Sequence, residues 1–94
     1  MECLNKIELS GVVGIVKRNV VDDSRVVRFS VEVRGVWFTC TAWVDDAPDA
    51  WGIEEGDWVR LVGRVRLIQY TTTDGVSKQT VDVFVNRLKH EKAD

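Results

Sequence analysis

The sequence is poor in the residue types on which most catalytic and metal-binding sites depend. It contains a single histidine, His90, and two cysteines, Cys3 and Cys40, which lie far apart and show no Cys-x-x-Cys spacing. A zinc site needs several such ligands at short spacing. Nucleophilic catalysis usually needs a histidine beside the nucleophile, whereas His90 lies in a charged tail that we expect to be solvated. We therefore expect no metal, no cofactor, no small-molecule substrate and no enzymatic activity.

Long hydrophobic runs and targeting signals are also missing. No apolar stretch approaches the ~18 residues that a membrane-spanning helix needs. Residues 1–6 are polar and lack the apolar core of a signal peptide. We therefore expect a cytoplasmic protein with no membrane partner, with reduced cysteines and Cys40 in the core. The length of 94 residues predicts one domain, residues 1–94.

Acidic residues are concentrated in one segment, although the whole chain carries a formal charge of −2. Six of the 15 acidic side chains lie between residues 45 and 57, where there is no lysine or arginine. The rest of the chain has 13 basic and 9 acidic side chains, a formal charge of +4. One face of an acidic protein can therefore be basic.

Five stretches rich in valine, isoleucine, threonine and aromatic residues predict β-strands. They cover residues 4–16, 25–34, 36–44, 58–70 and 78–87, with a loop at 17–24. Gly11 and Gly14 interrupt the first strand and indicate a bulge or a bend. Gly35 predicts a very short connection, and Asp74-Gly75 predicts a hairpin turn.

The segment between the third and fourth strands predicts a short helix or a single turn. Asp46 is a candidate cap, Pro48 suits the first helical position, and Gly52 or Gly56 can end the element. A long bent first strand with a helical element between strands three and four favours an all-β, five-stranded Greek-key barrel, the OB-fold. A small sandwich or an SH3-like barrel remains the alternative on pattern alone.

Alternation along residues 36–44 assigns the two faces of the third strand. Val36, Phe38, Cys40, Ala42 and Val44 share one uniformly apolar face, which we expect to lie in the core. The opposite face carries Trp37, Thr39, Thr41 and Trp43. Small hydroxyl residues do not cover neighbouring indole rings, so this face predicts two exposed tryptophans.

The fourth strand repeats this arrangement around Gly63, with valine and leucine at the inward positions 59, 61, 65 and 67. Its outward positions include Arg64, Arg66 and Tyr70, and the second strand adds Arg28 and Arg34. Aromatic side chains stack on bases, and arginines neutralise phosphates, so their combination is typical of single-strand binding. Exposed tryptophans also anchor subunit interfaces. We expect Trp51 and Trp58 to pack or to lie at an interface, and Arg60 to pair with the acidic segment.

Three motifs resemble the bacterial single-stranded DNA-binding protein family. Residues 5–14 are similar to its opening strand, with an Asn-Lys start and spaced glycines. Trp37 and Trp43 are similar to its third strand, which carries a stacking tryptophan and a second aromatic at this spacing. Residues 62–66 and Tyr70 resemble its fourth strand. The resemblance covers residues 4–88 and implies an OB-fold that assembles as a dimer or tetramer and wraps single-stranded DNA.

The resemblance also implies roles for individual residues. Trp37, Trp43 and Tyr70 would be the stacking residues, and Lys6, Arg64 and Arg66 would lie along the phosphates. Arg28 and Arg34 come from strand alternation instead, as do the hydroxyl residues Thr39 and Thr41. Two departures stand out: the hairpin between strands two and three has shrunk to Arg34-Gly35, and no acidic tip follows a flexible linker. This layout is also similar to the tail-less primosomal replication protein N family.

We therefore expect a sequence-tolerant single-stranded DNA-binding protein that forms homo-oligomers and acts in DNA replication, repair or recombination. The alternative is a protein-interaction module, such as a primosome or replisome accessory subunit, with little direct nucleic-acid binding. RNA or oligosaccharide binding is a third possibility, because OB-folds also bind those ligands.

Overall fold

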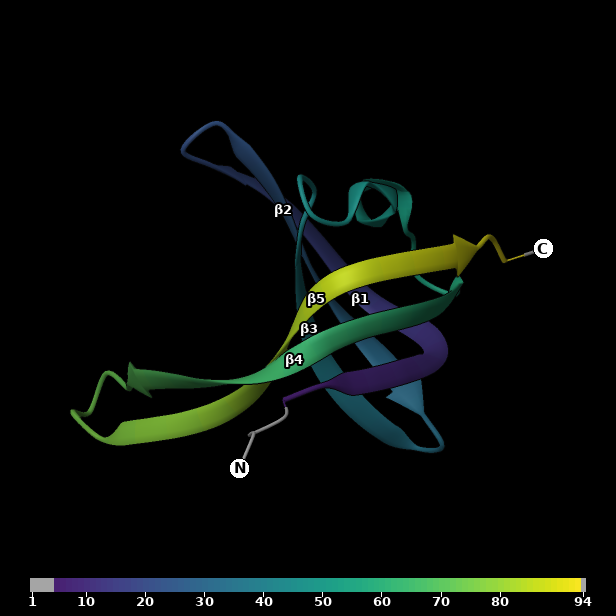
Figure 1. Ribbon diagram of the computed structural model, residues 1–94. Coiled ribbons are helices and arrows are strands. Elements are labelled where there is room, and N and C mark those ends of the chain that lie inside the picture. The colour runs from purple at the N-terminus through teal and green to yellow at the C-terminus, as the bar shows by residue number, and fades with distance from the viewer. Residues whose placement is uncertain (1–4, 94) are drawn as a thin grey trace, which may run out of the picture.

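The computed structural model describes residues 5–93 and contains one sheet that closes into a ring (Figure 1). Its elements are β1 (Ile7–Val21), β2 (Ser24–Val33), β3 (Val36–Trp43), the 3-10 helix η1 (Pro48–Gly52), β4 (Trp58–Thr71) and β5 (Ser77–Glu91). The order around the ring is β1-β2-β3-β5-β4, and β1 also pairs with β4. Strands β3 and β5 are parallel, and the other neighbours are antiparallel. The predicted five-stranded Greek-key OB-fold barrel is confirmed.

The core fills the inside of this ring because alternate side chains of each strand point inward. Val27, Cys40 and Val85 are fully buried there, and Ala50 and Ile53 add apolar side chains from η1 and the residue after it. Burial, with a smaller contribution from the charge of Asp82, raises the pKa of the Cys40 thiol to about 12. The predicted core position of Cys40 is confirmed. Between residues 5 and 93, no helix is long and apolar enough to span a bilayer.

The bulge predicted in the first strand is confirmed at Gly14, where the β1–β2 register shifts between Val13 and Val16. Two other glycines stand where barrel strands approach their neighbours closely. A Cβ atom on Gly11 would lie 2.0 Å from the carbonyl oxygen of Glu32. A Cβ atom on Gly63 would lie 2.2 Å from the carbonyl oxygen of Phe84. Gly63 also marks the point where the register between β4 and β5 shifts. Only a residue without a side chain allows both close approaches.

The predicted loop at residues 17–24 is wrong. Strand β1 continues to Val21, and a two-residue turn at Asp22 and Asp23 leads directly into β2. Both aspartates have positive φ angles, 50° and 65°, which suit the tight turn of a β-hairpin. The polar residues before the turn belong to a hairpin end whose side chains are exposed, so they lack the apolar alternation of a strand. The second short turn, at Arg34 and Gly35, is confirmed.

Strands β4 and β5 extend beyond the barrel as a long hairpin (Figure 1). We call its outer part, residues 65–81, the β4–β5 arm. Val65 and Leu67, predicted to point into the core, are 38% and 56% exposed because they lie on this arm. Val36, also predicted in the core, is 55% exposed at the start of β3. Alternation predicted the correct face of the sheet for these residues. It does not predict how far along the strand they lie from the core.

The ends of two elements also differ from the sequence expectations. The cap position of η1 is Ala47, which makes no side-chain cap, so Asp46 is not the cap; Pro48 does start the helix. Strand β5 runs to Glu91 and therefore includes the predicted charged tail. His90 is partly buried there, and its Nδ1 atom has no hydrogen-bond partner among the described residues. Its predicted solvated position is wrong.

Asp57 joins the segment after η1 to the C-terminal end of β5. Its carboxylate accepts hydrogen bonds from the backbone N–H groups of Glu54, at 2.9 Å, and Ala93, at 3.0 Å, and lies 3.4 Å from Lys92 Nζ. Burial opposes ionisation, but the two backbone N–H groups and the Lys92 ammonium together lower the pKa of Asp57. The ionised form therefore stabilises this end of the barrel.

We expect Gly63→Ala to destabilise the barrel, because the new methyl group would collide with backbone that is fixed by the ladder. Overpacking of this kind lowers the free energy of unfolding by about 1–3 kcal/mol. Urea denaturation of parent and variant measures this difference. Gly52→Ala is the matched control, since the nearest atom to its Cβ would be 4.0 Å away. Equal stability of the two variants would contradict the close approach at Gly63.

We expect Asp57→Asn to weaken the fold near neutral pH and to reduce its acid sensitivity. Because the pKa of Asp57 is lower in the folded state, its contribution is complete above the unfolded value of about 4. It is lost as the pH falls through the lower folded value. Thermal unfolding of parent and variant at a series of pH values should give curves that converge in acid. Asp49→Asn, at an exposed position, is the control; a constant gap at every pH would refute this role.

Candidate nucleic-acid interface

One cross-strand row runs around the outer surface of the barrel. The pairing registers place Lys17 of β1 beside Arg28 of β2, Arg28 beside Thr41 of β3, Thr41 beside Phe84 of β5, and Phe84 beside Arg64 of β4. We call these residues the central row. Three of the five are cations, and most of the neighbouring positions along the strands, such as Val27, Cys40 and Val83, are buried in the core. All five strands therefore contribute to one largely basic outer surface.

Trp37 lies on the same surface, at the start of β3, and is 57% exposed. Its ring packs beside Gly14 of β1, where an added Cβ would lie 2.5 Å from Trp37 Cζ3. Gly14 thus leaves space for the indole to rest against β1. A shallow groove next to it is lined by Gly14, Ile15, Ser30, Trp37 and Glu55. The predicted exposure of Trp37 is confirmed.

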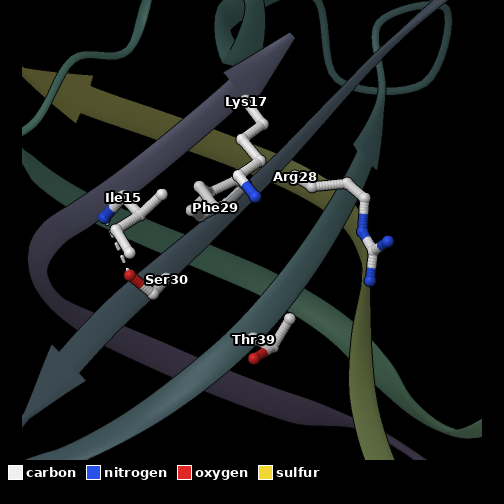
Figure 2. Close-up of a pocket in the computed structure, with 6 residues that line it drawn as sticks. All are labelled: Ile15, Lys17, Arg28, Phe29, Ser30 and Thr39. Atoms are coloured by element: carbon white, nitrogen blue, oxygen red, sulfur yellow. Dashed lines mark hydrogen bonds between the residues drawn. The ribbon is translucent and has the colours of Figure 1, made fainter. Parts of the chain in front are cut away.

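A second groove adjoins the first and shares Ile15 and Ser30 with it. It is lined by Ile15, Lys17, Arg28, Phe29, Ser30 and Thr39, and Figure 2 shows Lys17 and Arg28 extending from neighbouring strands. Ser30 Oγ accepts a hydrogen bond from the Ile15 N–H at 2.9 Å, where the β1–β2 register shifts. The groove is therefore lined by two apolar residues, two hydroxyl residues and two cations.

Two of the three other predicted residues of β3 are less accessible than the alternation suggested. Thr39 is exposed, but Trp43 is only partly exposed, and Thr41 is 5% exposed. Strand β5 packs beside Thr41, whose hydroxyl donates a hydrogen bond to Asp82 Oδ2 at 2.9 Å. The expectation that Thr41 lies open beside the tryptophans is wrong, because a neighbouring strand supplies a buried acceptor for it.

The outer face of β4 carries the predicted basic residues and Tyr70. Tyr70 is 47% exposed on the β4–β5 arm, opposite Lys78. It lies six residues beyond Arg64, which corresponds to about 20 Å along a strand. Trp37 and Tyr70 are therefore separate exposed aromatics. The structure does not gather the three predicted stacking residues into one cluster.

Lys6 lies at the edge of this basic surface. The side-chain amide of Asn5 makes hydrogen bonds of 2.7 and 2.8 Å with the backbone of Val65, and Ile7 pairs with Gly63. Continuing that register places Lys6 next to Arg64. Its ammonium group also lies 3.3 Å from Glu8. Arg34, by contrast, is exposed at the β2–β3 turn, away from the central row.

Phe84 is the main residue of this surface that the sequence interpretation missed. Its ring centroid lies 4.9 Å from the guanidinium carbon of Arg64 and 5.3 Å from that of Arg66, which are cation–π distances. The alternation of Asp82 and Phe84 with Val83 and Val85 is the signal that assigns it to the outer face. Lys17 was missed as well, because residues 17–24 were interpreted as a loop.

The remaining tryptophans lie away from this surface. Trp51 packs against the core, as expected, with the guanidinium of Arg25 5.0 Å from its ring centroid. Trp58 is 48% exposed and pairs with Val12 on the β1–β4 part of the barrel. Arg60 makes no salt bridge with the acidic segment among the described residues, so its expected pairing is wrong. No group of three or more potential metal ligands occurs within residues 5–93.

No family model matches the chain, and no curated protein matches its sequence. The fold, however, is similar to solved structures. One is the SSB of Plasmodium falciparum in complex with ssDNA, with a TM-score of 0.78 and 19% identity over 100% of this chain and 98% of that one. Another is Rim1, a mitochondrial single-stranded DNA-binding protein from S. cerevisiae, with a TM-score of 0.69 and 15% identity over 94% and 95% of the two chains. The chain therefore has the OB-fold found in these proteins.

Proposed function

We propose that this protein binds single-stranded DNA with little sequence preference, through base stacking and phosphate neutralisation. The observation that carries the proposal is Trp37, whose indole is exposed beside the groove that contains Lys17 and Arg28. Every base has a π-face, so a stacking side chain tolerates any sequence. The likeness in fold to a protein solved with ssDNA supports the proposal.

Four cations are the best candidates for phosphate contacts. Among the salt bridges of the described residues, none involves Lys17, Arg28, Arg34 or Arg64. Lys6 and Arg66 each have a carboxylate neighbour, at 3.3 and 3.1 Å, so they contribute less free charge. Thr39 supplies an exposed hydroxyl, whereas the buried Thr41 does not reach a ligand.

Stacking is divided between two regions of the surface. Trp37 serves the barrel face, and Tyr70 serves the β4–β5 arm, so a strand that contacts both has to run from the barrel onto the arm. Trp43 is partly covered, so less of its ring is accessible for stacking. With two separated aromatics and several cations, the protein holds an extended strand without a closed pocket. Such a surface binds without catalysing a reaction.

The proposed setting is DNA replication, repair or recombination in the cytoplasm, within a homo-oligomer related to the bacterial single-stranded DNA-binding proteins or to the tail-less primosomal type. Trp58 and Val12 form an exposed apolar pair away from the proposed DNA surface. This pair favours a protein contact, such as a second copy of the chain. It is also the observation that supports the alternative function, a protein-interaction module.

Oligo-dT should quench the tryptophan fluorescence of the protein, and added salt should weaken binding steeply. If four cations contact phosphates, the slope of log K against log salt should be about −3, since each contact on a single strand contributes about 0.7. Fluorescence titrations at several salt concentrations measure both effects. Unchanged emission and no gel retardation at low salt would count against the proposal.

Trp37→Ala should weaken oligo-dT binding by about 1–3 kcal/mol while leaving the barrel folded, because one base loses its stacking partner. Trp43→Ala should have a smaller effect in that range. Fluorescence anisotropy of a labelled oligonucleotide measures the affinities. Trp58→Ala is the control, since it removes a similarly exposed indole elsewhere on the barrel, and light scattering checks that its oligomeric state matches that of the parent. If Trp58→Ala costs as much as Trp37→Ala, the assigned face is wrong.

A further inference from the structure

A buried carboxylate lies beneath the basic outer surface. Asp82 is 1% exposed, and its Oδ2 atom accepts hydrogen bonds from the Thr41 hydroxyl, at 2.9 Å, and from Nη2 of Arg66, at 3.1 Å. Its Oδ1 atom has no hydrogen-bond partner among the described residues. A negative charge at this position is unexpected on a surface that binds phosphates.

Stability alone does not account for this carboxylate. Burial of a charge costs free energy unless all of its acceptor sites are satisfied, and here one oxygen has no partner. Arg66 is 44% exposed, so it would remain hydrated without Asp82. The ion pair is therefore a costly way to stabilise the barrel, and its effect must be sought in the position of Arg66.

The position of Arg66 is specific. Only one of its terminal nitrogens contacts Asp82, so the rest of the guanidinium group faces outward. The guanidinium carbon also lies 5.3 Å from the Phe84 centroid, while that of Arg64 lies 4.9 Å from the same ring. Two like charges beside one ring repel each other, and the nearby carboxylate offsets that repulsion. A long arginine side chain loses much rotamer entropy when it is held in one position, so fixing Arg66 beside Phe84 has an entropic cost.

We propose that Asp82 is a positioning residue: with Thr41, it holds the guanidinium of Arg66 beside Phe84, so that Arg64, Phe84 and Arg66 form a fixed contact surface for one nucleotide of single-stranded DNA. The surface offers planar groups on which a base can stack and N–H donors for its phosphate. Because the arginine is already ordered, the strand does not have to order it on binding. This inference rests on the proposed function.

The proposal and simple electrostatics predict opposite signs for Asp82→Asn. Removal of a negative charge should by itself strengthen binding to phosphates, as Glu32→Gln should do at an exposed position on β2 opposite Trp37. If Asp82 positions Arg66, Asp82→Asn should weaken the binding of labelled oligo-dT about threefold, a coupling typical of residues in direct contact. Tighter binding by Asp82→Asn would overturn the proposal.

A double-mutant cycle isolates the coupling to Arg66. Arg66→Ala should weaken binding about tenfold in the parent but only about twofold in the Asp82→Asn background. Arg34→Ala, at the β2–β3 turn, is the control and should cost the same in both backgrounds. Equal losses for Arg66→Ala in the two backgrounds would refute the positioning role. Thr41→Val, which keeps the side-chain volume, provides a second variant. In this background too, Arg66→Ala should cost less binding affinity than in the parent.

The free protein gives an independent measurement. Nitrogen-15 relaxation of the Arg66 Nε–Hε group should show a rigid side chain in the parent and a mobile one in Asp82→Asn, with thermal melts confirming that both are folded. A mobile Arg66 in the parent would refute the positioning role even if DNA binds. If the parent binds no oligonucleotide while Arg66 is rigid, the proposed function fails and the anchoring stands.

Discussion

The barrel closes through a very short contact, the parallel pairing of Cys40 with Val83 and of Thr41 with Phe84. The inner members of these pairs, Cys40 and Val83, are buried in the core, and the outer members form the middle of the central row. On either side of this contact, β3 and β5 have no further paired residues. The same contact thus completes the core and brings the β2–β3 ladder beside the barrel part of the β4–β5 ladder. Without it, Thr41 and Phe84 would not be neighbours, and the row from Lys17 to Arg64 would be interrupted.

This dependence explains which parts of the molecule the sequence predicted. Strand number, inner and outer faces, and the exposure of Trp37 follow from the alternation of side chains, which is a local property of each strand. The short Arg34-Gly35 turn and the bends at glycine are also local. These features were predicted correctly because they do not depend on residues that are distant in the sequence.

The errors, in contrast, depend on what lies beside a strand. Thr41 alternates with core residues along β3, a pattern typical of an exposed residue. In the structure, however, β5 brings Asp82 against it. Val65 and Leu67 alternate like core residues, yet the arm carries them past the barrel. Residues 17–24 looked like a loop because both faces of a hairpin end are exposed, which removes the apolar signal. Alternation places Phe84 on the outer face of β5, but its position beside Thr41 follows from the β3–β5 pairing.

The acidic net charge is compatible with a basic binding surface because the acidic side chains are concentrated in one segment, of which only Glu55 lines the two grooves at Trp37 and Arg28. Asp45 lies beyond the end of β3, four residues after Thr41 and at most about 13 Å along the chain. At physiological salt the screening length is about 8 Å, so a strand on the central row interacts mainly with the cations of that row. The acidic segment also retains two arginines, since Arg18 bonds the carbonyl oxygen of Trp51 and Arg25 stacks over its ring. The arginines at the central row are free of such contacts with η1, and the local charge pattern, not the total, sets the sign of the surface.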